Sequence, residues 1–343
     1  MLNSKYLFKK FVDYANLLSA FDKAFKTDRS SDSIYYRLEL SKNIYELHEK
    51  LNSGLWLPHE YTYFIISRPK VREISKANFE DRIVHHAYIS VIEPYYERDV
   101  FSPFSFASRI DRGVHKAVLQ AHEFFCANKY FLKTDIHHFF PSIDHEVLKA
   151  ILSRHLADTK IHRLENLIID NALRDREYDL FYRSHGLPIG NLTSQFWANV
   201  YLNELDEFIT SKGFSFVRYM DDTIIFSPGK ESLRSFLKEM REFLKEKLFL
   251  ELKETATLIS DNDNPLPFLG ISIRKDSLTI RSENYKRAMK NLKRTLYAYE
   301  KGKVSDAHLS SSLSSYNSYL WFDIENSPYA KLLNKALHKV RMI

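Results

Sequence analysis

The feature that most constrains this chain is a pair of adjacent aspartates, Asp221 and Asp222, between two apolar, β-branched and aromatic runs in residues 216–226. Such runs around a short polar break are typical of a β-hairpin, here with the carboxylates at or beside its tip. Because Asp is common in turns, a plain hairpin turn explains this segment equally well when it is taken alone.

A third aspartate favours a catalytic site over a plain hairpin turn. Asp135 lies inside another short strand-like run, residues 132–136. Charged groups rarely occupy a buried strand unless they are paired or bind a metal. Two unit charges about 4 Å apart repel by about 4 kcal/mol at an effective dielectric near 20, so carboxylates brought together from two strands need cations. Two divalent ions about 3.5–4 Å apart are an arrangement that catalyses phosphoryl transfer.

Composition limits the class of protein. The 343 residues suffice for two or three domains, and no run of about 18 apolar residues could span a membrane. The N-terminus lacks the long apolar core of a signal peptide, so we expect a cytoplasmic protein. The single cysteine, Cys126, excludes an internal disulfide, and its aromatic surroundings predict a buried, inert thiol.

Positive charge is concentrated near the C-terminus. Residues 281–343 hold twelve Lys and Arg against five Asp and Glu, whereas the rest of the chain is close to balance. A helix expected over residues 283–300 has an apolar stripe and a separate basic face. That face suits the phosphate backbone of a nucleic acid, although a merely solvated face is the alternative. Its members are Lys286, Lys290, Lys293 and Arg294.

Periodicity predicts a mixture of helices and strands. Helices are expected over residues 1–52, 79–96, 115–127, 145–156, 160–185, 230–248 and 283–300, with another after residue 195. Strands are expected over residues 61–66, 132–136, both arms of 216–226, 250–253 and the end of 265–273. The adjacent histidines His85 and His86 lack the i, i+4 spacing of a helical metal site, so we expect polar decoration there.

Two segments suggest contacts to a nucleotide. Pro69 forces extended backbone before it, and if strand alternation resumes afterwards, Lys70 and Arg72 share one face that suits a triphosphate. Surface charge is the alternative. Residues 186–195 hold two glycines and a proline, and they open a helix. Glycine permits close backbone approach, and a helix N-terminus favours an anion; an ordinary loop-to-helix junction is the alternative.

Three features have the order and spacing found in reverse transcriptases: Asp135, the Gly-Leu-Pro-Ile-Gly loop at 186–190 and Tyr-Met-Asp-Asp at 219–222. The chain resembles that family over roughly residues 55–275. The resemblance implies an α+β, right-hand polymerase fold with fingers, an antiparallel-sheet palm and a helical thumb. It implies two Mg²⁺ ions bound by Asp135 and Asp221, with Asp222 as a third ligand. The implied partners are an RNA template, a primer and dNTPs.

The resemblance also assigns domains and binding residues. It implies an N-terminal helical extension (1–54), fingers (55–131 and 145–185), a palm (132–144 and 186–277) and a thumb (278–343). Phe140 matches the aromatic gate that excludes a ribose 2′-hydroxyl, and Lys70 and Arg72 match residues that hold the incoming triphosphate. The other implied contacts are Ile189, Gly190 and Gln195 for the nucleotide, and Phe268, Leu269, Gly270 and the basic 283–300 face for primer and template.

One departure from the family pattern suggests a subtype. Many reverse transcriptases carry Gln before the loop glycine, where this chain has Ile189. With Asn191-Leu192-Thr193 and residues 199–206, this variant resembles the enzymes of diversity-generating retroelements. Those enzymes copy a template-repeat RNA with errors at adenines and work with a small basic accessory protein. Because Ile cannot hydrogen-bond a nucleotide as Gln can, we expect Ile189 to contribute to misincorporation, by ~0.5–1.5 kcal/mol of selectivity.

A second departure concerns a lysine that many relatives place before a threonine after the long helix. Here Ala256 precedes Thr257, and Lys253 is the candidate substitute. Two rival interpretations stay open: a retron or defence-associated reverse transcriptase, and a non-catalytic RNA-binding scaffold that kept the fold. The presence of all three carboxylates favours an enzyme.

Overall fold

A four-stranded antiparallel sheet, in the order β4-β5-β3-β6, lies at the centre of the fold. The computed structural model describes residues 5–67, 71–171 and 185–319. The central strands are β3 (Tyr130–Thr134), β4 (Ser215–Tyr219), β5 (Asp222–Ser227) and β6 (Leu258–Asp261). The combination of this sheet with many helices confirms the predicted α+β class.

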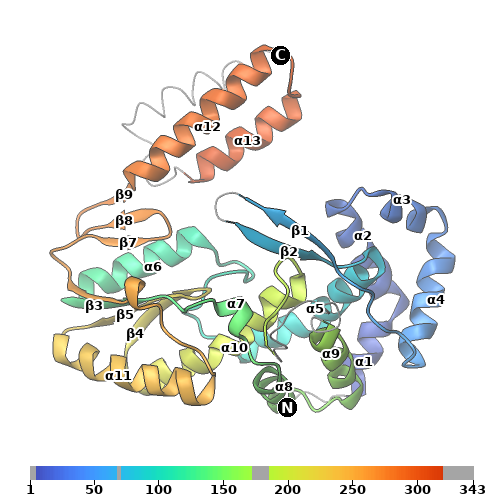
Figure 1. The fold of residues 1–343 in the computed structure, drawn as a ribbon, viewed down its shortest axis with the longest axis horizontal. Helices are drawn as coiled ribbons and strands as arrows, with labels where there is room; N and C mark the ends of the chain where they lie inside the picture. The colour runs from blue at the N-terminus through green and yellow to red at the C-terminus, as the bar shows by residue number, and fades with distance from the viewer. Residues whose placement is uncertain (1–4, 68–70, 172–184, 320–343) are drawn as a thin grey trace.

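Helices cover both faces of the central sheet. Successive residues of a strand point to opposite faces, so Phe216 joins the larger of two apolar cores and Val217 the smaller. Figure 1 shows α11 (Lys230–Lys247) on one side of the sheet and α6 (Val114–Ala127) on the other, with α10 (Leu192–Ser211) beside α11. Because both faces are covered, the strands can be apolar nearly throughout, and any charged residue on them needs a partner.

The N-terminal part is helical, as residues 1–52 predict. Its helices are α1 (Lys5–Val12), α2 (Tyr14–Thr27), α3 (Ser31–Leu38) and α4 (Leu40–Asn52), followed by α5 (Phe79–Asp99). The expectation that His85 is surface decoration is wrong, because its ring is buried on the same face of α5 as Ile89 and Ile92. Burial lowers the pKa of His85 to about 3, so the imidazole is neutral in the fold.

A two-stranded hairpin follows α4, and three further helices follow the first central strand. β1 (Thr62–Ile66) pairs antiparallel with β2 (Arg72–Lys76), and this pair projects away from the helices (Figure 1). The helices are α7 (Phe139–Ser142), α8 (His145–His155) and α9 (Thr159–Asn171). Of the helix predicted over 160–185, residues 172–184 lie outside the described residues, and His185 forms an isolated bridge with Asp144 rather than helix.

The C-terminal part begins with a small sheet that leads into a helical lobe. Strands β7 (Leu266–Phe268), β8 (Ile271–Ile273) and β9 (Leu278–Ile280) form an antiparallel sheet in that order. Helices α12 (Ser282–Glu300) and α13 (Asp306–Tyr319) follow and pack on each other, in a lobe set apart from the central sheet (Figure 1). Leu292 of α12 and Leu309 of α13 extend the smaller core into this lobe.

Two local predictions are wrong. Residues 250–253 form no strand, because only Leu252 pairs there, in an isolated bridge with Ile136. Cys126 is exposed rather than buried, since the buried stripe of α6 passes through its neighbour Phe125 instead. Within the ranges that the structure describes, no helix is both long enough and apolar enough to cross a membrane.

Candidate active site

The paired aspartates lie at a tight hairpin. In the register of β4 and β5, Tyr219 is opposite Asp222, which leaves Met220 and Asp221 as the two turn residues. Met220 has a positive φ of 55°, a conformation that a non-glycine residue rarely adopts. The predicted hairpin with its carboxylates at the tip is therefore confirmed.

The ladder between β3 and β5 brings the third aspartate to this tip. Thr134, the last residue of β3, is opposite Thr223 of β5, so Asp135 follows at the end where Asp222 begins its strand. Burial raises the pKa of Asp221 above its ordinary value, and the charge of Asp135 raises it further. The two carboxylates are thus close enough to repel each other, although they are far apart in the sequence.

The donor set at this tip suits a divalent cation, because Mg²⁺ is commonly bound by one or two carboxylates together with substrate phosphates. Among the described residues, no group of three or more His, Cys, Asp and Glu side chains is arranged to hold a metal ion. The charges of Asp135 and Asp222 both raise the pKa of Asp221, so the three predicted carboxylates gather at this tip. Asp222 also forms an ion pair, since its Oδ2 lies 2.9 Å from the Nζ of Lys133, and its role as a third ligand stays a prediction.

The glycine loop is held between two elements that flank the aspartates. On one side, the Ile189 carbonyl accepts a hydrogen bond from the Ser75 amide of β2 at 2.8 Å. On the other side, the Phe140 carbonyl of α7 accepts one from the Leu187 amide at 2.9 Å. Gly190 has a φ of +118°, and a Cβ there would lie 2.8 Å from Ile74 Cγ2. The loop therefore needs glycine at this position, both for its backbone and for its contact with β2.

The predicted nucleotide contacts surround this loop. Arg72, the first residue of β2, is exposed, and its charge lowers the pKa of Asp221 against the larger effect of burial. Phe140 is half-buried beside the loop, and Gln195 is exposed in the first turn of α10. Lys70 lies outside the described residues.

The predicted primer contacts differ in what they expose. Phe268 is 1 % exposed in the smaller core, whereas Leu269 and Gly270 form the turn between β7 and β8 with positive φ values of 49° and 84°. The surface therefore offers the Leu269–Gly270 turn rather than the Phe268 ring.

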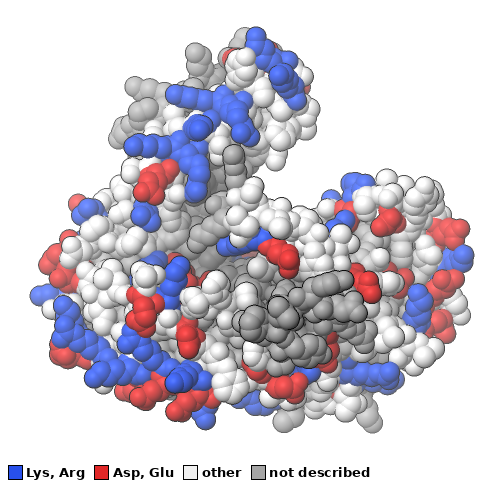
Figure 2. Space-filling view, in the orientation of Figure 1, with Lys and Arg blue, Asp and Glu red and all other residues white. Residues whose placement is uncertain are grey.

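All four predicted cations of α12 are exposed, opposite its buried residues Ala288 and Leu292. Figure 2 shows Lys and Arg gathered on this lobe, and it shows the surface notched between the lobe and the N-terminal helices. This arrangement leaves the basic face available to a polyanion.

A buried network that the sequence reasoning missed holds the aspartate turn. Arg218 and Asp206 are both 0 % exposed, and the guanidinium donates to the two carboxylate oxygens at 2.7 and 2.6 Å. Its remaining nitrogen donates to Asn199 Oδ1 at 3.1 Å and to the Met220 carbonyl at 3.2 Å. The available signal was an arginine inside an apolar strand, because a buried charge requires a partner.

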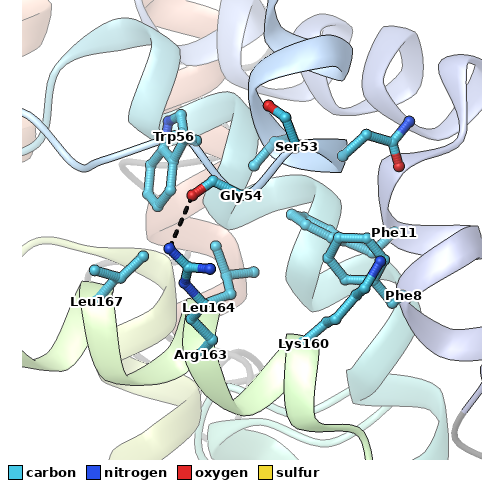
Figure 3. A pocket seen from close by; sticks show the side chains of 11 residues that line it. Phe8, Phe11, Ser53, Gly54, Trp56, Lys160, Arg163, Leu164 and Leu167 are labelled. Atoms are coloured by element: carbon cyan, nitrogen blue, oxygen red, sulfur yellow. Dashed lines mark hydrogen bonds between the residues drawn. The ribbon is translucent and has the colours of Figure 1, made fainter.

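A separate cavity lies away from the carboxylates and the glycine loop. A cavity of about 230 Å³ opens between α1, the end of α4 and α9, with Phe8, Trp56 and Lys160 in its wall (Figure 3). Arg163 Nη2 crosses it to donate to the Gly54 carbonyl at 3.0 Å. None of the predicted site residues lines this cavity, so we base the site on the carboxylates and the glycine loop instead.

Comparison with known proteins agrees with this geometry. The sequence profile of the reverse transcriptase (RNA-dependent DNA polymerase) family matches residues 66–273. The group II intron-encoded protein LtrA of Lactococcus lactis subsp. cremoris is 26% identical over 323 residues, which cover 74% of this chain and 53% of LtrA. The retron Ec73 reverse transcriptase of Escherichia coli is 25% identical over 295 residues, which cover 80% of this chain and 89% of that protein.

A solved structure supports the fold alone. Telomerase from Candida tropicalis, in complex with a TWJ fragment of telomeric RNA, aligns with a TM-score of 0.51 at 13% identity, over 81% of this chain and 57% of that one. The chain spans about half the length of LtrA, so the match concerns the shared region. Because the family profile covers more than half of the 343 residues, this chain belongs to the reverse transcriptase family.

Proposed function

We propose that this protein is an RNA-directed DNA polymerase that extends a primer on an RNA template with dNTPs. The observation that carries the proposal is the meeting of Asp135 and Asp221 at one end of the β3–β5 ladder, close enough for the charge of one to raise the pKa of the other. Two repelling carboxylates beside an exposed arginine, Arg72, suit a metal-bound triphosphate.

In the proposed mechanism, Asp135 and Asp221, with Asp222 as the predicted third ligand, would hold two Mg²⁺ ions. When bound, these ions would supply the charge that lowers the pKa of the primer 3′-hydroxyl and stabilises the leaving pyrophosphate. Arg72, with Lys70, binds the triphosphate. Phe140 contacts the sugar, and the loop at Ile189 and Gly190 contacts the base pair.

The proposed domain division follows the resemblance. The β1–β2 hairpin belongs to the fingers, the central sheet and the glycine loop to the palm, and α12–α13 to the thumb. The exposed cations of α12 then follow the phosphate backbone of the template–primer duplex, an interaction that weakens as salt rises.

A primer-extension assay tests the enzyme proposal. Asp135→Asn and Asp221→Asn should each reduce Mg²⁺-dependent DNA synthesis by about a thousandfold or more, because several kcal/mol of transition-state stabilisation are lost. Asp263→Asn is the matched control, since Asp263 is an exposed carboxylate paired with Lys275 away from the site. Equal synthesis by Asp221→Asn and the unchanged chain would favour the alternative of a non-catalytic RNA-binding scaffold.

Within this activity, we propose the diversity-generating subtype, with an adenine-mutagenic cDNA product and a small basic accessory protein. Ile189, Asn191 and residues 199–206 support it. A retron type is the second candidate, favoured by the relative that is matched over 89% of its length. Sequencing the cDNA separates them: errors concentrated at template adenines support the first, and a uniform low error rate supports the second.

A further inference from the structure

Lys133 lies in the middle of the central sheet and joins two parts of the candidate site. Its Nζ donates hydrogen bonds to Asp222 Oδ2 at 2.9 Å and to the Pro267 carbonyl at 2.9 Å. The same ammonium lies 5.6 Å from the centroid of the Phe268 ring. One side chain therefore contacts the aspartate turn and the strand that leads into the Leu269–Gly270 turn.

The two parts that Lys133 joins belong to different sheets. Asp222 begins β5 of the central sheet, and Pro267 lies in β7 of the C-terminal sheet. Backbone ladders fix residues within each sheet, but no ladder joins β5 to β7 in the described part of the chain. Apolar packing between the sheets is less directional than a hydrogen bond, so the Lys133 contacts are well suited to set their spacing near the carboxylates.

The contact is partly shielded from solvent. The side chains of Lys133 and Asp222 are 18 % and 24 % exposed, and Asp222 Oδ1 is buried with no hydrogen-bond partner in the described structure. Removing the ammonium would leave the carboxylate and the Pro267 carbonyl without this donor. Because both groups would then be undersatisfied, we expect β7 and the aspartate turn to shift relative to each other.

We propose that Lys133 is a positioning residue that sets the primer 3′ end against the catalytic carboxylates, by tying Asp222 to the strand before the Leu269–Gly270 turn. The proposal rests on the proposed polymerase function and on the primer lying at that turn. Lys133 itself contacts neither substrate nor the reacting atoms. It acts through Asp222 and Pro267, which makes Asp222 a structural anchor as well as an acidic residue of the site.

The test compares Lys133→Met and Lys133→Gln with Lys129→Met. Lys129 precedes β3, at the end of the strand opposite Asp135, and its ammonium lies over the Tyr130 ring. Its replacement by Met therefore removes a lysine at the other end of the same strand and serves as the matched control. Single-turnover extension should slow by about tenfold to a hundredfold in Lys133→Met, since a misplacement of about 1 Å can cost about a hundredfold. The apparent Kd for dNTP should stay within about twofold, because Arg72 and the glycine loop are unchanged.

A second readout does not depend on catalysis. With 2-aminopurine at the primer 3′ end of a bound RNA–DNA hybrid in EDTA, Lys133→Met should change the fluorescence relative to the unchanged chain, and Lys129→Met should not. Asp222→Asn should produce the same change, and the double variant with Lys133→Met should add nothing further. Lys133→Gln keeps a neutral N–H donor group in place of the ammonium, so its signal should lie between those of the unchanged chain and Lys133→Met.

Three outcomes would overturn the positioning role. They are an unchanged primer-end signal in Lys133→Met, equal losses in dNTP affinity and extension rate, and effects of Lys133→Met and Asp222→Asn that multiply in the double variant. If Lys133→Met does not fold, Lys133→Gln and its fluorescence decide. Failure of the polymerase proposal looks different, since the unchanged chain would then make no DNA at all.

Discussion

The buried pair of Arg218 and Asp206 gives the sharpest prediction about the aspartate turn. Both side chains are fully buried, and the guanidinium donates hydrogen bonds to Asp206, Asn199 and the Met220 carbonyl. Burial raises the pKa of Asp206 against the opposing charge of Arg218. Each buried charge therefore depends on the other, and the pair also holds the turn that carries Asp221.

The expected magnitudes separate these two roles. Asp206→Leu leaves a buried guanidinium without its counterion, which costs about 3–5 kcal/mol out of a typical total of about 5–15 kcal/mol. The double variant Asp206→Leu with Arg218→Met replaces both charges by apolar groups of similar size, a change that is often neutral for stability. However, the double variant still lacks the hydrogen bond to the Met220 carbonyl, so the turn is no longer fixed.

Urea unfolding and primer extension together test this reasoning. We expect Asp206→Leu to lower the unfolding midpoint strongly and the double variant to recover most of it, while extension by the folded double variant stays about a hundredfold slow because the turn is misplaced. Asp263→Leu, on the exposed surface, should change neither quantity by much. The reasoning fails if Asp206→Leu costs less than about 1 kcal/mol, or if the double variant extends primers at the rate of the unchanged chain.

Three further predictions concern His85, Gly190 and Ile189. Between about pH 6 and 4, His85 binds a proton in the unfolded chain but not in the folded one, where its pKa is about 3. Lowering the pH through this range should therefore reduce the free energy of unfolding by about 1.4 kcal/mol per pH unit through His85. Urea unfolding of His85→Leu should lack this contribution. Gly190→Ala should lower stability and raise the KM for dNTP more than Gly213→Ala does. Both glycines have a positive φ, but only at residue 190 would the added Cβ meet a neighbour, Ile74. Equal effects of the two substitutions would contradict the close-contact argument. Ile189→Gln should lower adenine errors by up to about tenfold relative to Ile189→Leu, and sequenced cDNA with no such difference would rule out the hydrogen-bond explanation.

Local patterns predicted the elements of the site better than its connections. The apolar runs around Asp221 and Asp222 predicted the β4–β5 hairpin, and helical periodicity predicted the bounds of α11 and α12 closely. It also predicted α10, although that helix begins at Leu192, before the predicted start after residue 195. These features depend on residues near one another in the chain. The partners of Arg218 and Lys133 depend on which strand pairs with which, information that no short segment contains.

The remaining errors have a related cause. A strand was expected at residues 250–253, but there the chain reaches the sheet through one bridge at Leu252, and the fourth strand is instead β6, which sequence patterns did not indicate. His85 was assigned from its spacing to His86 and Cys126 from its aromatic neighbours, whereas their burial follows the rotation of α5 and α6 against the rest of the fold. Neighbouring residues in the sequence alone cannot give that rotation.

The strand order has a consequence for synthesis on the ribosome. β3, which leads to Asp135, pairs only with β5 and β6 in the described sheet, and both emerge later in translation. Until then the backbone edges of β3 lack hydrogen-bond partners and its apolar side chains are uncovered, so the nascent chain is exposed to aggregation during this interval. The proposed polymerase site would form in one step, when β5 and β6 pair with β3. A translation product that stops before β5 would therefore lack the site altogether.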